Sequence, residues 1–217
     1  MSTLDAAQPL LDVRQLRKQF ADRIAVDQVS MYVKAGQLVG LAGPNGSGKS
    51  TLLRLLAGLL RADAGTGSVM GCALGQLDRS GRNQIGYLPQ RAALYPRISV
   101  FENLRFRAAV AGLTEPSTAT RAAIALLGLE DRATEPLGQF SGGWIRRIEI
   151  AATLIHSPRL VLLDEPTTGL DERARAHIWQ QLDACRARGG AVVFSSHDST
   201  ELQHATLCLQ LGRAHGY

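Results

Sequence analysis

Between residues 10 and 40, short apolar runs alternate with polar turns. The runs cover residues 10–13, 29–33 and 38–41. Apolar runs of this length bounded by polar residues predict β-strands, and we expect these three to form a small antiparallel sheet. A helical pattern of apolar positions follows over residues 50–57 and ends at Gly58, because a glycine commonly terminates a helix.

The middle of the chain changes from strand patterns to helix patterns. Residues 63–67 have the composition of a turn, and a short strand is predicted over residues 85–90. From about residue 95 to residue 156 the apolar positions recur with helical periods, which indicates a helical lobe inserted between strands. Within this lobe we predict helices over residues 101–112, over 118–127 with Ser117 as N-cap, and over 145–155.

Two more strands are predicted in the last third of the chain. Residues 160–163 are apolar without interruption, as expected of a strand buried on both faces of a sheet. A helix is expected to follow residues 167–171 and to continue through Leu182, and residues 191–194 form the next strand. The pattern predicts one α/β domain over residues 10–212, with a mixed or parallel sheet, a small antiparallel β subdomain and the inserted helical lobe.

Composition fits a globular domain with a sizeable core. The chain has 217 residues, of which 45% are hydrophobic and 20% charged. Lysine and arginine exceed the acidic residues by five, which suits an anionic ligand or an anionic membrane face but is too small an excess to indicate nucleic acid. The first nine residues lack the features of a secretory signal, and no apolar run approaches the ~20 residues of a membrane span. We therefore expect a cytosolic chain with free thiols at Cys72, Cys185 and Cys208.

A phosphate-binding loop lies between the predicted strand and helix near residue 45. The pattern G-x-x-x-x-G-K-[ST] lets backbone N–H groups converge on phosphate oxygens, with a lysine for the β- and γ-phosphates and a hydroxyl for Mg²⁺. A simple glycine turn would not explain Lys49 and Ser50 directly behind the last glycine. We therefore predict a nucleoside triphosphate site at Gly43, Pro44, Asn45, Gly46, Ser47, Gly48, Lys49, Ser50 and Thr51.

Two acidic residues follow the buried strand at residues 160–163. Ligands of parallel sheets bind at the C-terminal ends of the strands, where this strand delivers Asp164 and Glu165. Neighbouring side chains on a strand point to opposite faces, so the two acids need not share a role. We assign Asp164 to Mg²⁺ through water and Glu165 to orienting and deprotonating the attacking water.

Four further features are candidates for the same site. Phe20 could stack on a nucleobase or fill the small sheet, and Gln90 could hydrogen-bond a metal-bound water. His197 follows the strand at residues 191–194 and could hydrogen-bond the γ-phosphate, although a lone histidine is more often structural. Ser141, Gly142 and Gly143 open a helix, either as a second anion site or as a cap with flexible glycines.

Taken in order, these motifs resemble the nucleotide-binding subunit of ABC transporters, from Leu10 to about Gly212. The resemblance implies a phosphate-loop ATPase core that binds ATP and Mg²⁺. It matches Phe20 with the adenine-stacking aromatic, residues 43–51 with Walker A, Gln90 with the Q-loop, Ser141-Gly142-Gly143 with the signature, Asp164 with Walker B, Glu165 with the catalytic carboxylate, Asp171 with the D-loop and His197 with the switch histidine.

The resemblance also implies partners and a location. Two such subunits, a homodimer in the simplest case, pack head to tail so that each signature covers the ATP of the other. A separate transmembrane permease binds them at the cytoplasmic face of the plasma membrane. The residues around the motifs are most similar to those of exporter subunits. Trp144 departs from the family, which usually has a non-aromatic residue there, and the short segment after Leu211 leads us to expect no accessory regulatory domain.

Two alternatives are weighed against an exporter ATPase. A soluble ABC-type ATPase acting on DNA would carry a long coiled coil between Lys49 and Ser141, and one acting on ribosomes would carry two such domains; neither feature is present here. Another phosphate-loop enzyme, such as a small-molecule kinase, would not need Ser141-Gly142-Gly143 before the acidic strand.

Overall fold

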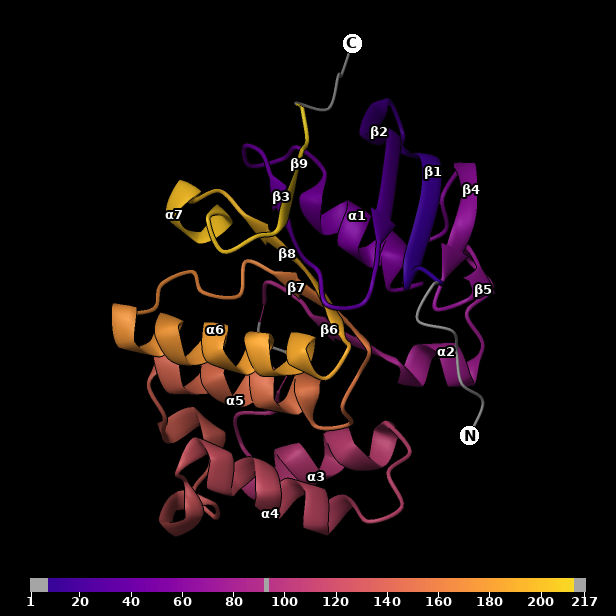
Figure 1. Cartoon of the computed structure of the whole chain (residues 1–217). Helices are drawn as coiled ribbons and strands as arrows, with labels where there is room; N and C mark the ends of the chain where they lie inside the picture. Colours follow the sequence, from indigo (N-terminus) through magenta and orange to yellow (C-terminus); the bar gives the residue numbers. More distant parts are fainter. Residues whose placement is uncertain (1–7, 92–93, 213–217) are drawn as a thin grey trace.

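The computed structural model describes residues 8–91 and 94–212. Residues 1–7, to which most of the expectation of no secretory signal applies, lie outside the described residues. The sheet that contains β1, β2 and β4 lies at one end of the molecule, and a helical lobe containing α3 and α4 lies at the other end (Figure 1). Within the described ranges, no helix has both the length and the apolar character needed to cross a membrane.

A five-stranded parallel sheet forms the centre of the molecule. Its strand order is β6-β7-β8-β3-β9. Because the strands are parallel, their C-terminal ends meet at one edge of the sheet. The strands are β3 (Leu38–Ala42), β6 (Ile85–Leu88), β7 (Leu160–Asp164), β8 (Ala191–Ser196) and β9 (Leu207–Gln210).

The assignment of residues 38–41 to the antiparallel sheet is wrong. β3 pairs in parallel with β8 and with β9. All five of its residues are buried. Val39 packs with α1 on one face, and Leu38 belongs to the cluster under α6 on the other. A strand covered on both faces suits the interior of a parallel sheet.

A smaller antiparallel sheet has the order β2-β1-β4-β5. The prediction of a turn over residues 63–67 is also wrong, because residues 64–67 begin β4. Gly67 has φ +141°, and a Cβ there would lie 2.1 Å from the Asp12 carbonyl oxygen. The glycines of β4 therefore allow its backbone to approach β1 closely. The strands are β1 (Leu11–Phe20), β2 (Arg23–Val33), β4 (Ala64–Val69) and β5 (Cys72–Ala73).

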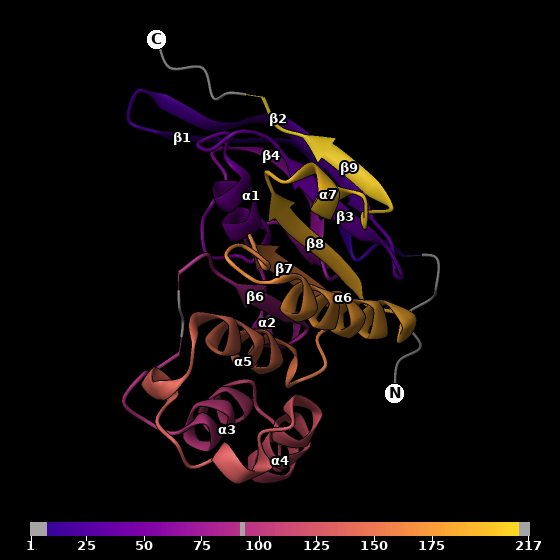
Figure 2. The same cartoon turned by 90° about the vertical axis from the view of Figure 1, so that its left-hand side faces the viewer.

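Helices cover the parallel sheet and build the lobe. α1 packs on the face of the sheet that also meets the antiparallel sheet, and α6 packs on the opposite face. Figure 2 shows α3 and α4 at the end of the molecule farthest from β1 and β2. The helices are α1 (Lys49–Leu56), α2 (Arg79–Asn83), α3 (Val100–Val110), α4 (Pro116–Leu127), α5 (Gly142–Leu154), α6 (Glu172–Ala187) and α7 (Ser199–Leu202), with 3₁₀ turns at Glu130–Arg132 and Leu137–Gln139.

Helix starts follow their capping residues, with one correction. Ser117 is not the N-cap of α4, because the helix already begins at Pro116 after Glu115. Proline fits the first helical position, where its missing N–H costs no hydrogen bond. α5 is the helix that joins the two ends of the molecule, since Ile148 packs in the lobe and Ile150 packs against the parallel sheet.

Candidate nucleotide-binding site

The phosphate-binding loop runs from the end of β3 to the start of α1. Gly43, Gly46 and Gly48 have φ values of +150°, +81° and +95°. A Cβ at Gly48 would lie 1.9 Å from the Ala25 carbonyl oxygen, so this position requires glycine. Gly48 precedes α1 without a side-chain cap, which leaves the first N–H groups of the helix available to an anion.

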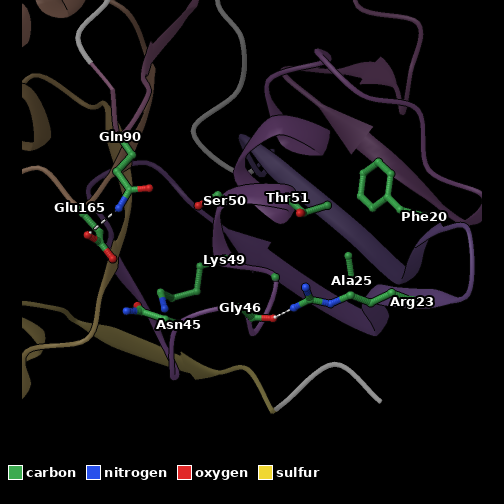
Figure 3. Close-up of a pocket in the computed structure, with 11 residues that line it drawn as sticks. Phe20, Arg23, Ala25, Asn45, Gly46, Lys49, Ser50, Thr51, Gln90 and Glu165 are labelled. Carbon is green, nitrogen blue, oxygen red and sulfur yellow. Dashed lines mark hydrogen bonds between the residues drawn. The ribbon is translucent and has the colours of Figure 1, made fainter. Parts of the chain in front are cut away.

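Lys49 and Arg23 bring positive charge to this loop. The Lys49 ammonium donates to the carbonyl oxygens of Gly43 and Pro44 at 2.7 and 3.0 Å. The Arg23 guanidinium donates to the Gly46 carbonyl oxygen at 2.7 Å, as Figure 3 shows. Both cations therefore contact main-chain carbonyl groups of the loop.

The loop forms one wall of a cavity of about 420 Å³ (Figure 3). Phe20 ends β1 and is 46% exposed at the cavity, so it does not fill the core of the small sheet. Gln90 and Glu165 line the opposite side. The lining residues are Phe20, Arg23, Ala25, Asn45, Gly46, Gly48, Lys49, Ser50, Thr51, Gln90 and Glu165.

Asp164 ends β7 and is almost fully buried. Its Oδ1 accepts a hydrogen bond from the Ser195 hydroxyl at 2.7 Å. Its buried Oδ2 has no hydrogen-bond partner among the described residues. A buried carboxylate oxygen without a partner is costly, and a hydrated cation would supply one. The Asp164 carboxylate and the Ser50 hydroxyl thus fit the oxygen donors that Mg²⁺ prefers.

Glu165 is surrounded by side chains from three loops. Its carboxylate accepts a hydrogen bond from the Gln90 amide at 3.1 Å and one from the Thr168 hydroxyl at 3.3 Å. His197 Nδ1 lies 3.4 Å from Glu165 Oε1. The His197 side chain is 53% exposed, which argues against a packed structural role. Gln90, Glu165 and His197 therefore form one cluster at the C-terminal edge of the parallel sheet.

The predicted signature lies apart from the phosphate-binding loop. Ser141 caps α5 by accepting from the Trp144 N–H at 3.4 Å. Ser141, Gly143, Trp144 and Asp171 line a second cavity, of about 690 Å³. The residues that line this cavity come from α4, α5, α6 and the adjoining loops. The structure thus does not bring the signature into the cavity of its own phosphate-binding loop.

Two details of the second cavity bear on its chemistry. Asp171 caps α6 by accepting from the Ala174 N–H at 2.8 Å, and its side chain also faces the cavity. The Arg147 guanidinium lies 4.0 Å from the centre of the Trp144 ring. Trp144 and Arg147 therefore present an aromatic and cationic pair at this cavity.

Several buried polar residues beside the site were not predicted from the sequence. Ser195 donates to Asp164 and accepts from the Glu165 N–H, and Glu201 accepts from the hydroxyls of Thr167 and Ser196. Arg146 donates to main-chain carbonyls around Glu165. For Arg146 and Glu201, the one sequence signal is a charged residue on a helix that has a buried face.

Comparison with known proteins assigns the family. The family model described as ABC transporter matches residues 26–168. The chain belongs to the ABC transporter family. It is 37% identical over 205 residues to the linearmycin resistance ATP-binding protein LnrL of Bacillus subtilis (strain 168), covering 94% of this chain. It is also 37% identical over 210 residues to the Nod factor export ATP-binding protein I of Burkholderia pseudomallei (strain K96243), again covering 94% of this chain.

The chain is shorter than these ABC relatives. It spans 65% of LnrL and 68% of the Nod factor export protein. Solved structures match over most of both chains. The ATP-binding subunit of an ABC transporter superimposes with a TM-score of 0.83 at 28% identity, covering 93% of this chain and 85% of that one. A dimeric ATP-binding cassette bound to ADP and Pi gives a TM-score of 0.82 at 25% identity, covering 93% and 94%. The predicted fold class is therefore confirmed.

Proposed function

We propose that this chain binds and hydrolyses ATP to drive export through a separate membrane-spanning subunit. The observation that carries the proposal is the convergence of Lys49, Gln90 and Glu165 on the cavity that Phe20 also lines. Relatives named for Nod factor export and for linearmycin resistance favour export as the direction. The transported compound would be selected by the membrane subunit.

In this proposal each group has a separate role. Phe20 stacks on adenine, and the backbone N–H groups of residues 43–51 with Lys49 hold the phosphates. Bound Mg²⁺, held by Ser50, Gln90 and Asp164, would neutralise phosphate charge. Glu165 orients the attacking water and accepts its proton.

His197 completes the catalytic group by donating to the γ-phosphate. His197 Nδ1 lies 3.4 Å from Glu165 Oε1. The imidazole could therefore contact the γ-phosphate while the carboxylate contacts the attacking water. Gln90 connects the same carboxylate to the loop after β6. The Glu165 carboxylate therefore contacts both Gln90 and His197 without bound nucleotide.

A second copy of this chain supplies what the first cavity lacks. Ser141, Gly142 and Gly143 open α5 toward cavities that the phosphate-binding loop does not line. A head-to-tail pair would place this helix N-terminus over the phosphates held by the other copy, with Asp171 beside it. The dimeric ATP-binding cassette of similar fold supports pairing of two copies.

The membrane subunit docks in a groove between the sheet and the lobe. This groove of about 450 Å³ is lined by Leu59, Pro89 and Val110 among others. Leu59 and Val110 are 59% and 61% exposed, so the groove offers apolar surface to a partner. Pro89 directly precedes Gln90, which gives the docked subunit a route to the Glu165 carboxylate. Such docking would hold the chain peripherally at the cytoplasmic face of the membrane.

Two variants test the proposed chemistry. Glu165→Gln keeps the shape of the side chain but removes the base, so turnover should fall about 100-fold or more while ATP affinity stays within about twofold.

Lys49→Ala removes a cation from the phosphates, so ATP affinity should weaken by about 10- to 100-fold. Calorimetry with ATP and a phosphate-release assay measure both effects. Wild-type turnover in Glu165→Gln, or wild-type affinity in Lys49→Ala, would refute the corresponding role.

A further inference from the structure

Arg146 lies in the second turn of α5, five positions after Ser141, and is only 9% exposed. A guanidinium carries five N–H donors. Nε donates to the Pro166 carbonyl oxygen at 3.0 Å. Nη1 donates to the Pro89 carbonyl oxygen at 3.2 Å and to the Glu149 carboxylate at 3.1 Å. Nη2 donates to the carbonyl oxygens of Asp164 and Glu165 at 2.8 and 2.9 Å, so five hydrogen bonds leave from this one side chain.

The carbonyl acceptors belong to the two loops that carry the proposed catalytic side chains. Asp164, Glu165 and Pro166 form the end of β7 and the start of the loop after it. Pro89 is the residue before Gln90, whose amide donates to the Glu165 carboxylate. Arg146 therefore connects the helix that opens with the signature to the main chain on both sides of the Gln90–Glu165 hydrogen bond.

The backbone at Glu165 needs such support. Glu165 has φ +47°, a left-handed conformation that a residue with a Cβ adopts only at a cost in free energy. The Ser195 hydroxyl accepts from its N–H, and Arg146 donates to its carbonyl oxygen, so both peptide groups are held. The direction of the Glu165 carboxylate follows from this fixed backbone.

We propose that Arg146 is a positioning residue that aligns the Glu165 carboxylate for hydrolysis from the helix carrying the signature. The inference rests on the proposed function, because it assigns Glu165 the catalytic role. Arg146 does not face the cavity of the phosphate-binding loop, so it acts through the backbone of Glu165 and not on the nucleotide.

The planar shape of arginine is central to this role. A lysine at the same position would keep a positive charge beside Glu149 but would carry its N–H donors on a single nitrogen. One nitrogen cannot reach the carbonyls of Pro89, Pro166 and Glu165 together. We therefore expect Arg146→Lys to fold but to hold the Glu165 carboxylate less precisely in place.

The experiment measures ATP affinity and turnover separately for the full chain carrying Arg146→Gln or Arg146→Lys. Both variants should bind ATP within about twofold of wild type, while kcat falls about tenfold to a hundredfold, the range expected for a small misplacement of a catalytic group. Unfolding curves give the folded fraction used to normalise kcat. If Arg146→Gln does not fold, Arg146→Lys decides the outcome.

A matched control comes from the helical lobe. Arg132 forms the same kind of pair, donating to Glu135 three residues later, and its guanidinium lies 4.1 Å from the centre of the Phe140 ring. Arg132→Gln removes an arginine–glutamate pair that lies in the helical lobe, where the Arg132 side chain contacts Glu135 and Phe140. Its kcat per folded molecule should stay within about twofold of wild type.

The double variant Arg146→Gln with Glu165→Gln separates positioning from general damage. If Arg146 acts through Glu165, adding the first substitution to the second should change the residual turnover by less than about twofold. A further loss by the full factor of the single variant would overturn the inference, as would wild-type kcat in both Arg146 variants. If the wild-type chain does not hydrolyse ATP, the proposed function fails and the inference falls with it.

Discussion

The two carboxylate oxygens of Asp164 have different surroundings. Ser195 holds its Oδ1, and its Oδ2 is buried without a hydrogen-bond partner in the described part of the chain. An asparagine would keep the contact with Ser195 and lose the negative charge. This separates the orientation of the side chain from its role toward a cation.

Asp164→Asn should therefore remove the activation of ATP hydrolysis by Mg²⁺. We expect turnover at saturating Mg²⁺ to fall about 100-fold, while ATP binding in the presence of EDTA stays within about twofold of wild type. Turnover measured over a Mg²⁺ titration checks the first result, and calorimetry checks the second. An unchanged Mg²⁺ dependence would remove Asp164 from the metal site.

Sequence motifs readily identify candidate ligand-binding side chains. They identify less readily the side chains that hydrogen-bond the main chain. Lys49 is predicted by its motif, and Gln90 and Glu165 by their places at the ends of predicted strands; the structure brings all three to one cavity. Arg146 and Ser195 were not expected. Arg146 donates mostly to main-chain carbonyl oxygens, and Ser195 accepts from a main-chain N–H. Nearly every residue possesses such groups, so these partners leave no pattern in the sequence.

At the scale of elements, β4 differs most from its prediction. Gly65 and Gly67 resemble turn glycines in sequence, yet both lie in a strand that pairs with β1. Their φ values of +106° and +141° and their contacts below 3 Å with β1 backbone explain why glycine is required. A strand specified by the close approach of two backbones lacks the apolar alternation by which strands are recognised.

Gly67→Ala tests this explanation against Gly71→Ala. Gly71 also has a positive φ, +76°, but a Cβ there would meet nothing within 4 Å among the described residues. Gly71→Ala should lower the free energy of unfolding by about 1 kcal/mol through backbone strain. Gly67→Ala should cost about 1–3 kcal/mol more, because it adds the overlap with Asp12. Urea unfolding measures both values, and equal losses would contradict the close-approach explanation.

At the scale of the whole molecule, the phosphate-binding cavity and the signature lie at separate places on the chain. The sequence pattern correctly predicts a helical lobe and an apolar strand that ends at Asp164. It does not predict which motifs share a cavity, because this depends on how α5 spans the lobe and the parallel sheet. The separation makes the proposed second copy of the chain the central requirement of the account.

Light scattering of Glu165→Gln with and without ATP and Mg²⁺ tests that requirement most directly. A paired control adds Gly142→Arg, because a Cβ at Gly142 meets nothing within 4 Å among the described residues, so the larger side chain should block a partner without disturbing the fold. We predict twice the mass of one chain when Glu165→Gln binds ATP, and the mass of one chain when Gly142→Arg is added. Glu165→Gln that binds ATP but keeps the mass of one chain would contradict the account.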